Sequence, residues 1–172
     1  DEVAERLDLS GHRGVHPRLG AVDVVPFVAL APTAASTAVE AAREYAEWVV
    51  AAHGVPVFLY GDADPQARSL PEARRDAFRT RAPDLGPAEP HPRLGAVAVG
   101  ARPPLVAINV ELATDDLELA RRVAAAVRER DGGLPGVRAL GLALPERGHA
   151  QVSMNLVALE RTGIEEPGRA TR

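Results

Sequence analysis

The sequence predicts an α+β fold made of two related halves, and two observations lead to this prediction. The segment HPRLGAV occurs twice without change, at His16–Val22 and at His91–Val97. An unchanged repeat of this length in a chain of 172 residues indicates an internal duplication. Each copy also precedes an alternation of apolar strands and amphipathic helices. We therefore expect a first half over residues 1–85 and a second half over residues 86–172.

The first half is typical of a β-α-β unit that follows the end of a helix. A strand is expected over residues 21–30, with Pro26 favouring an edge position or a bulge. Residues 36–53 carry apolar side chains at helical spacing, and Gly54 is a natural helix end. Residues 55–60 form a short buried strand. The expected connection between the two strands is a parallel, right-handed crossover.

The second half repeats this plan and adds a hairpin. Strands are expected over residues 94–100 and 105–112, followed by a helix over residues 115–130. Residues 137–144 and 150–159 flank a short turn, which predicts an antiparallel pair. The order strand, helix, strand, strand is typical of a split β-α-β sandwich with its helices on one face, the ferredoxin-like arrangement.

Composition excludes several kinds of chemistry. The chain has no cysteine and no lysine, so all 20 basic residues are arginine. A thiol nucleophile, a zinc–thiolate site, a Schiff base and a P-loop lysine are therefore excluded. The net charge of −4 and the 3% of aromatic residues argue against binding of nucleic acid. Without a membrane-spanning run or a secretory pattern, the chain is expected to be cytoplasmic.

Histidines are the side chains best suited to proton transfer near neutral pH. His12 and His16 lie in a glycine-broken loop before the first strand, where a partly exposed imidazole acts as a general acid or base. The alternative is a pair of solvent-exposed loop histidines. No metal site is expected, because Gly14 and Pro17 prevent the helix that their spacing would need and no third ligand is evident.

Three further positions are candidates for ligand binding. His91 lies in the stiff, proline- and glycine-rich loop Gly86–Gly95, which a flat ligand can approach closely; the alternative is an ordinary linker. Asp23 needs a partner in its strand, and Arg18 or a ligand are the candidates. Asn155 belongs to the polar face of the last strand, which is either outer surface or the wall of a cleft.

Several segments resemble the glutamate formiminotransferase family, that is, the formiminotransferase domain of formiminotransferase-cyclodeaminases. These segments are HRGVHPRLGAVDVVPF, GVPVFLYG, APDLGP, HPRLGAVAVGARPPLVAINVEL and AQVSMNL. The resemblance implies two ferredoxin-like α/β subdomains related by duplication, with folate bound between them. It also implies transfer of the formimino group of N-formimino-L-glutamate to N5 of tetrahydrofolate, a co-substrate, without a metal.

The resemblance also assigns roles to residues. His16 matches the family's catalytic histidine. The family's folate-contacting loop matches Gly86, Pro87, Ala88, Glu89, Pro90, His91, Pro92, Arg93, Leu94 and Gly95. The supporting candidates are His12, Arg18, Asp23, Arg102 and Asn155. Arginines near the cleft suit the substrate carboxylates, because a guanidinium pairs with a carboxylate through two parallel hydrogen bonds, and Arg18, Arg93 and Arg102 are equal candidates.

The family's opening strand–helix–strand segment and its closing helix and strand have no counterpart in this sequence, so we expect a domain truncated at both ends. Sheet edges exposed in this way need to be covered by another segment or chain, and a second copy in a homodimer could cover them. A non-catalytic folate-binding or oligomerisation module derived from the family is therefore the alternative to an enzyme. A small-ligand regulatory domain is a third hypothesis, which depends on fold analogy alone.

Overall fold

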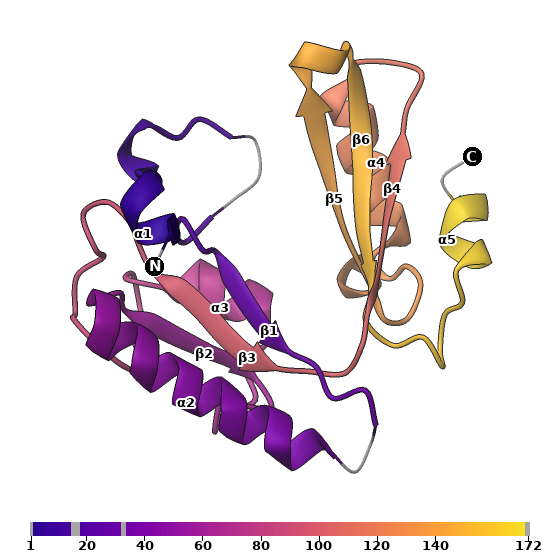
Figure 1. The fold of residues 1–172 in the computed structure, drawn as a ribbon. Coiled ribbons are helices and arrows are strands. Elements are labelled where there is room, and N and C mark those ends of the chain that lie inside the picture. Colours follow the sequence, from indigo (N-terminus) through magenta and orange to yellow (C-terminus); the bar gives the residue numbers. More distant parts are fainter. Residues whose placement is uncertain (1, 15–17, 32–33, 171–172) are drawn as a thin grey trace. The chain divides into compact units, whose positions relative to one another are not determined.

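The computed structural model describes residues 2–14, 18–31 and 34–170. The chain forms two compact units, Asp1–Pro103 (unit 1) and Pro104–Arg172 (unit 2). Each unit has its own three-stranded sheet among the described residues (Figure 1). The division after Pro103 differs from the expected boundary near residue 85, because the strand that begins at Val97 pairs within unit 1.

Unit 1 contains a parallel sheet whose last strand in the sequence lies in the middle. The strands are β1 (Val24–Phe27), β2 (Val57–Gly61) and β3 (Val97–Ala101), in the order β1-β3-β2. Strand β3 and most of β2 are buried on both faces, which is typical of parallel strands covered by helices. Pro26 lies on the edge strand β1, as predicted, where its missing N–H leaves no gap in the ladder.

Helices cover both faces of this sheet. Helix α2 (Ala35–His53) packs on one face through small and β-branched side chains, and Gly54 ends it in the left-handed conformation with φ 63°. Helix α3 (Leu70–Asp76) packs on the opposite face, where its Ala73 contacts Tyr60. Unit 1 thus has a helix on each face of its sheet, because the connection between β2 and β3 contains α3. A short helix α1 (Glu2–Arg6) and a 3-10 turn η1 (Leu9–Gly11) precede β1.

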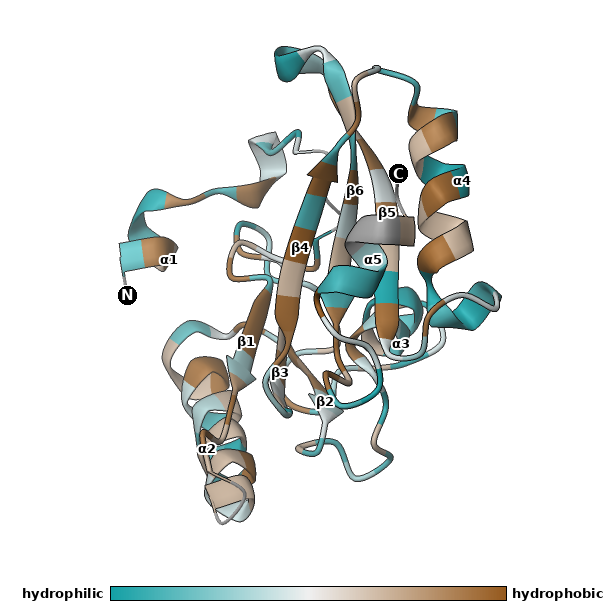
Figure 2. Cartoon of the chain, turned by 90° about the vertical axis from the view of Figure 1, so that its right-hand side faces the viewer, coloured by the Kyte–Doolittle hydropathy of each residue, from teal (hydrophilic) through white to brown (hydrophobic). Residues whose placement is uncertain are grey.

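Unit 2 contains an antiparallel sheet covered by one helix. The strands β4 (Val106–Glu111), β5 (Val137–Leu144) and β6 (His149–Leu156) have the order β4-β6-β5. The predicted β5–β6 hairpin is confirmed. Helix α4 (Leu117–Val127) begins after Asp116, whose side chain accepts a hydrogen bond from the Leu119 amide. Apolar and polar bands alternate along β4 in Figure 2, matching its alternating burial.

The remaining short elements of unit 2 are η3 (Glu129–Asp131), η4 (Pro145–Arg147) and α5 (Glu165–Ala170).

Both sheets place their last strand between the other two, as in a split β-α-β unit. However, that strand is parallel in unit 1 and antiparallel in unit 2. The described elements form a mixed α/β fold, compatible with the predicted α+β class.

The repeated segment does not divide between the two units. Both copies belong to unit 1, one before β1 and the other leading into β3. This arrangement differs from the expectation of one copy in each half. It also explains why β1 starts at Val24 rather than at residue 21: the first copy pairs with the second before the parallel ladder begins.

Candidate functional site

The two copies of the repeat lie against each other at equivalent residues. Gly20 and Gly95 form an isolated antiparallel bridge. Two backbone hydrogen bonds flank it, from Ala21 N to Leu94 O at 2.9 Å and from Ala96 N to Leu19 O at 3.0 Å. We call this arrangement, residues 19–21 against 94–96, the repeat crossing. It joins the segments that carry the two predicted site histidines.

The repeat crossing requires glycine at both of its central positions. A Cβ atom on Gly20 would lie within 3.0 Å of the carbonyl oxygen of Ala96, and one on Gly95 would lie within 3.0 Å of the carbonyl oxygen of Leu19. Gly95 also has φ 69°, a conformation that favours glycine. Close backbone approach is thus the physical reason for the glycine in each copy of HPRLGAV.

His91 is held inside a tight turn formed by its own copy of the repeat. Its Nδ1 accepts hydrogen bonds from the amides of Arg93 at 3.2 Å and Leu94 at 3.0 Å. The backbones of His91 and Gly95 exchange two further hydrogen bonds, both of 2.8 Å. Because Nδ1 is the acceptor, the proton of the neutral ring resides on Nε2. The half-buried ring therefore offers one N–H donor of fixed direction.

The rest of the predicted folate loop has two parts. Residues 86–90 are exposed, whereas Leu94 is 8% exposed and belongs to the core. Gly86 has φ 89°, and a Cβ atom there would lie 3.1 Å from Val50 and 3.2 Å from Pro56. The backbone of the loop is therefore accessible to solvent at residues 86–90, and the loop is anchored to the core at Leu94.

Arg93 connects the loop Gly86–Gly95 to the start of the chain. Its Nη2 donates to the carbonyl of Leu7 at 3.2 Å, and its Nε lies 3.7 Å from the carboxylate of Asp8. Its own carbonyl accepts from the Leu9 amide at 2.7 Å. The structure thus gives Arg93 a role in holding the N-terminal segment.

The predicted residues of the first histidine loop are placed only in part. His16 lies outside the described residues. His12 is exposed, and its Nε2 accepts a hydrogen bond from the Gly14 amide at 3.0 Å. The two histidines thus accept backbone hydrogen bonds through different ring nitrogens, His12 through Nε2 and His91 through Nδ1. Arg18 is also exposed.

Asp23 has a partner that sequence analysis did not find. One carboxylate oxygen accepts a hydrogen bond from the Leu19 amide at 2.6 Å, and the other pairs with Nη2 of Arg74 on α3. Neither Arg18 nor a ligand is needed to satisfy this carboxylate, so the expectation for its partner is corrected. No local signal could have identified Arg74, because α3 lies far along the chain and meets Asp23 only through tertiary packing.

The last two candidates belong to different units. Arg102 follows β3 in unit 1, and its Nη1 donates to the carbonyl of Pro103 at 2.9 Å. Asn155 lies on β6 in unit 2, exposed and opposite Ala107 and Arg138 of the flanking strands. The alternation of burial along β6 places Asn155 on the sheet face that α4 does not cover.

A buried ionic cluster organises the connection between β2 and α3. The Asp64 side chain is fully buried and pairs with Arg68, whose Nε lies 2.6 Å from a carboxylate oxygen. Arg81 pairs with Asp84 and lies over the ring of Phe58 at 5.6 Å. Burial raises the pKa of Asp64, but hydrogen bonds from Arg68 and the Gln66 amide, with the charges of Arg68 and Arg81, outweigh it and lower the pKa.

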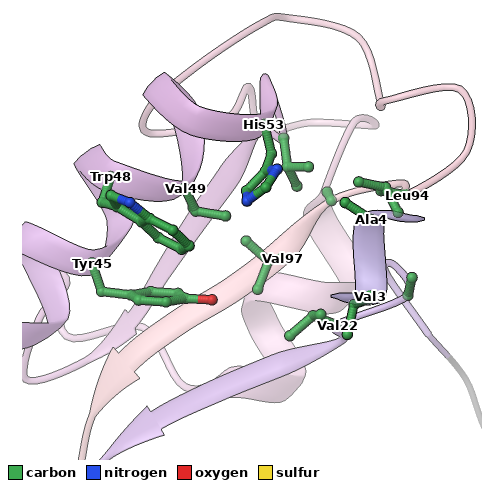
Figure 3. Close-up of a pocket in the computed structure, with 12 residues that line it drawn as sticks. Val3, Ala4, Val22, Tyr45, Trp48, Val49, His53, Leu94 and Val97 are labelled. Carbon is green, nitrogen blue, oxygen red and sulfur yellow. The ribbon is translucent and has the colours of Figure 1, made fainter. Parts of the chain in front are cut away.

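A small apolar pocket lies beside the repeat crossing. It encloses about 150 Å³ between α1, α2 and the sheet of unit 1 (Figure 3). Its lining includes Val3, Val22, Tyr45, Trp48, His53 and Leu94. Burial raises the pKa of Tyr45, and Trp48 is 47% exposed. The pocket suits an apolar group, because its walls are mostly aliphatic and aromatic.

Within residues 2–14, 18–31 and 34–170, no three histidine or carboxylate side chains come together as a metal-ligating group. In the same ranges, no helix has both the length and the apolar character needed to cross a bilayer.

Fold and site together define an α/β protein of two units with a candidate site on glycine-rich loops. The sequence matches the model of the "Formiminotransferase domain, N-terminal subdomain" over residues 1–102 and that of the "Formiminotransferase domain" over residues 107–167. These two matches meet where the structure divides into units. The chain belongs to the formiminotransferase family, as the resemblance predicted.

Individual relatives agree with this family. The chain is 38% identical to a glutamate formimidoyltransferase of Streptococcus pyogenes serotype M1, and the match covers 94% of the chain and 58% of the relative. The corresponding values for a glutamate formimidoyltransferase of Thermoplasma acidophilum are 38%, 94% and 57%. A formimidoyltransferase-cyclodeaminase of Sus scrofa is 37% identical over 92% of the chain and 32% of the relative. The chain thus spans less than three fifths of the two microbial relatives.

Proposed function

We propose that the protein containing this chain is a glutamate formimidoyltransferase, which transfers the formimino group of N-formimino-L-glutamate to N5 of tetrahydrofolate. The observation that best supports the proposal is the repeat crossing, because it joins the segment that carries His16 to the loop that carries His91. The names of the relatives, at 38% identity over 94% of the chain, support the same activity.

The reaction is an addition followed by an elimination. N5 of tetrahydrofolate attacks the formimino carbon and loses its proton, while a new C–N bond forms. The bond from that carbon to the glutamate nitrogen then breaks, and this nitrogen gains a proton. One histidine that is neutral at the start can accept the first proton and return it in the second step. We assign this role to His16, which matches the family's catalytic histidine.

We assign the folate co-substrate to the loop Gly86–Gly95. The exposed residues 86–90 offer backbone groups that a flat pterin ring can approach, and the Nε2–H of His91 adds one directed donor. Among the three arginine candidates for the substrate carboxylates, Arg18 is the best supported. Arg18 and Arg93 are both exposed, but Arg93 donates to the carbonyl of Leu7, and Arg102 donates to that of Pro103. His12 and Asn155, which are also exposed, stay supporting candidates for substrate contact.

For the complete domain we propose two ferredoxin-like subdomains related by duplication. The middle position of the last strand in each sheet supports this proposal. We further propose a cytoplasmic homodimer, in which the partner covers edge strands such as β1.

A transferase assay on the full-length protein tests the proposed function. We expect turnover of N-formimino-L-glutamate with tetrahydrofolate, and we expect His16→Ala to abolish turnover while folinic acid still raises the melting temperature. His149→Ala is the matched control, because His149 lies at the start of β6 in unit 2 and has no assigned role, so this variant should retain most of the activity. Absence of turnover in the wild-type protein, with folate binding intact, would favour the non-catalytic folate-binding module instead. Absence of any shift with folates would contradict both hypotheses.

A further inference from the structure

Leu19 is an anchor point of unit 1, fixed through three different groups. Its amide donates to the Asp23 carboxylate at 2.6 Å, and its carbonyl accepts from the Ala96 amide at 3.0 Å. Its side chain packs with buried residues on the α3 face of the sheet, including Phe58 and Ala73. The chain is therefore held firmly at Leu19, only three residues after His16 in the sequence.

Arg74 and Asp23 connect this anchor to helix α3. The two side chains form an ion pair and are only 24% and 21% exposed, so water screens their attraction less than at an open surface. The Nε of Arg74 is buried and has no hydrogen-bond partner among the described residues, which leaves Asp23 as the ion-pair partner that orients the guanidinium. One carboxylate thus contacts both the helix and the Leu19 amide.

Helix α3 is itself well fixed in the fold. A capping box formed by Ser69 and Glu72 closes its first turn, with the Ser69 amide donating to the Glu72 carboxylate at 2.8 Å. Ala73, next to Arg74, is fully buried against Tyr60 and packs with Ala98 of β3. Arg74 therefore projects from a rigid support.

We propose that Arg74 is a positioning residue for the formimino transfer. Arg74 orients the Asp23 carboxylate, which holds the Leu19 amide, and Leu19 in turn sets the direction of the chain toward His16. This inference depends on the proposed function. An error of about 1 Å in the placement of a catalytic group lowers the rate about 100-fold. Loss of the ion pair should therefore lower kcat about 10-fold to 100-fold, with little change in the KM of either substrate.

The experiment compares variants of the full-length enzyme. Arg74→Gln removes the charge of the guanidinium, and Asp23→Asn removes the charge of the carboxylate while keeping an oxygen that accepts from the Leu19 amide. We expect both to lower kcat, with the double variant no worse than the more severe single one, because the pair acts as a unit. Arg75→Gln is the matched control: Arg75 lies on the same helix, is 63% exposed, pairs with Asp76, and its variant should keep wild-type kcat.

Two further measurements separate positioning from simple loss of stability. Arg74→Lys restores the charge without the planar guanidinium and should recover part of kcat; it also serves as the test variant if Arg74→Gln does not fold. Hydrogen exchange of the Leu19 amide should accelerate in Arg74→Gln at a temperature well below its melting point. Unchanged kcat in a folded Arg74→Gln would overturn the proposal, as would a rise in KM alone, which would make Arg74 a substrate ligand.

These outcomes are distinguishable from failure of the proposed function. If the wild-type enzyme shows no turnover, both the proposed function and the positioning role of Arg74 are rejected. If the wild type is active and His16→Ala is inactive, but Arg74→Gln matches the wild type, only the positioning role is overturned.

Discussion

Gly20 and Gly95 occupy the same place in two copies of one heptapeptide, and in the folded chain they lie opposite each other in an antiparallel bridge. Neither position has room for a Cβ atom, because a backbone carbonyl of the other copy lies in the way. The repeat therefore pairs with itself. This pairing holds the loop Gly86–Gly95 and the segment after His16 at a common point.

Alanine at either glycine should destabilise the protein. The backbones must separate to admit a methyl group, so we expect Gly20→Ala and Gly95→Ala to lower the free energy of unfolding by about 2–4 kcal/mol each. Gly95→Ala should be the more severe, because its φ of 69° adds strain. Denaturant unfolding measures both. Gly11→Ala is the control, since a Cβ there meets no atom within 4 Å; equal stability of all three variants would contradict a close crossing.

Substitution of His91 should distinguish the structural role of its Nδ1, which accepts hydrogen bonds in the turn, from the binding role of its Nε2–H donor. Asparagine can accept from the Arg93 and Leu94 amides as an Asx turn does, but it lacks the Nε2–H of the imidazole. We expect His91→Asn to keep the melting temperature and to lose about 1 kcal/mol of folate affinity, the value of one hydrogen bond. Titration with folinic acid measures this loss. His149→Asn, at the start of β6, should bind folinic acid like the wild type; a similar loss there would remove the case for His91.

The buried carboxylate of Asp64 should govern acid stability. Asp64→Asn should lower the free energy of unfolding by about 3 kcal/mol, because it breaks a buried ion pair with Arg68. The pKa of Asp64 is lowered in the folded state, so its stabilisation is present above the ordinary value of 3.8 and is lost as pH falls through the folded-state pKa.

Unfolding of wild type and Asp64→Asn across acidic pH tests this linkage. The stability difference between them should shrink as the pH falls below 3.8. The exposed Glu118, 68% accessible, provides the control variant Glu118→Gln, which should follow the wild type at every pH. A stability difference that stays constant with pH would mean that Asp64 keeps its ordinary pKa.

Tyr45 should have the opposite pH dependence. Burial raises its pKa above 10.0, so the neutral phenol stabilises the fold below that pH, and this stabilisation is lost as the pH rises through the folded-state pKa. Tyr45→Phe has no such group, so the wild type should lose stability relative to it in alkaline solution. Denaturant unfolding at neutral and alkaline pH measures the difference. Parallel pH curves for the two proteins would show that Tyr45 titrates normally.

Local patterns in the sequence predicted most of the regular elements. Helix α2 was expected over 36–53 and spans Ala35–His53, and β5 has the predicted bounds 137–144. The β5–β6 hairpin and the edge position of Pro26 were also predicted. These features depend on side-chain periodicity and on residues with restricted backbones, which act within a few residues along the chain.

The tertiary structure decided everything that depends on contacts between distant segments. It placed β3 in unit 1, paired Gly20 with Gly95, and gave Asp23 the partner Arg74. The sequence by itself determined the family, most of the elements and the fact of the repeat. Only the folded chain determined that the two copies meet, because strand pairing across a long separation is set by the packing of the whole sheet and its helices.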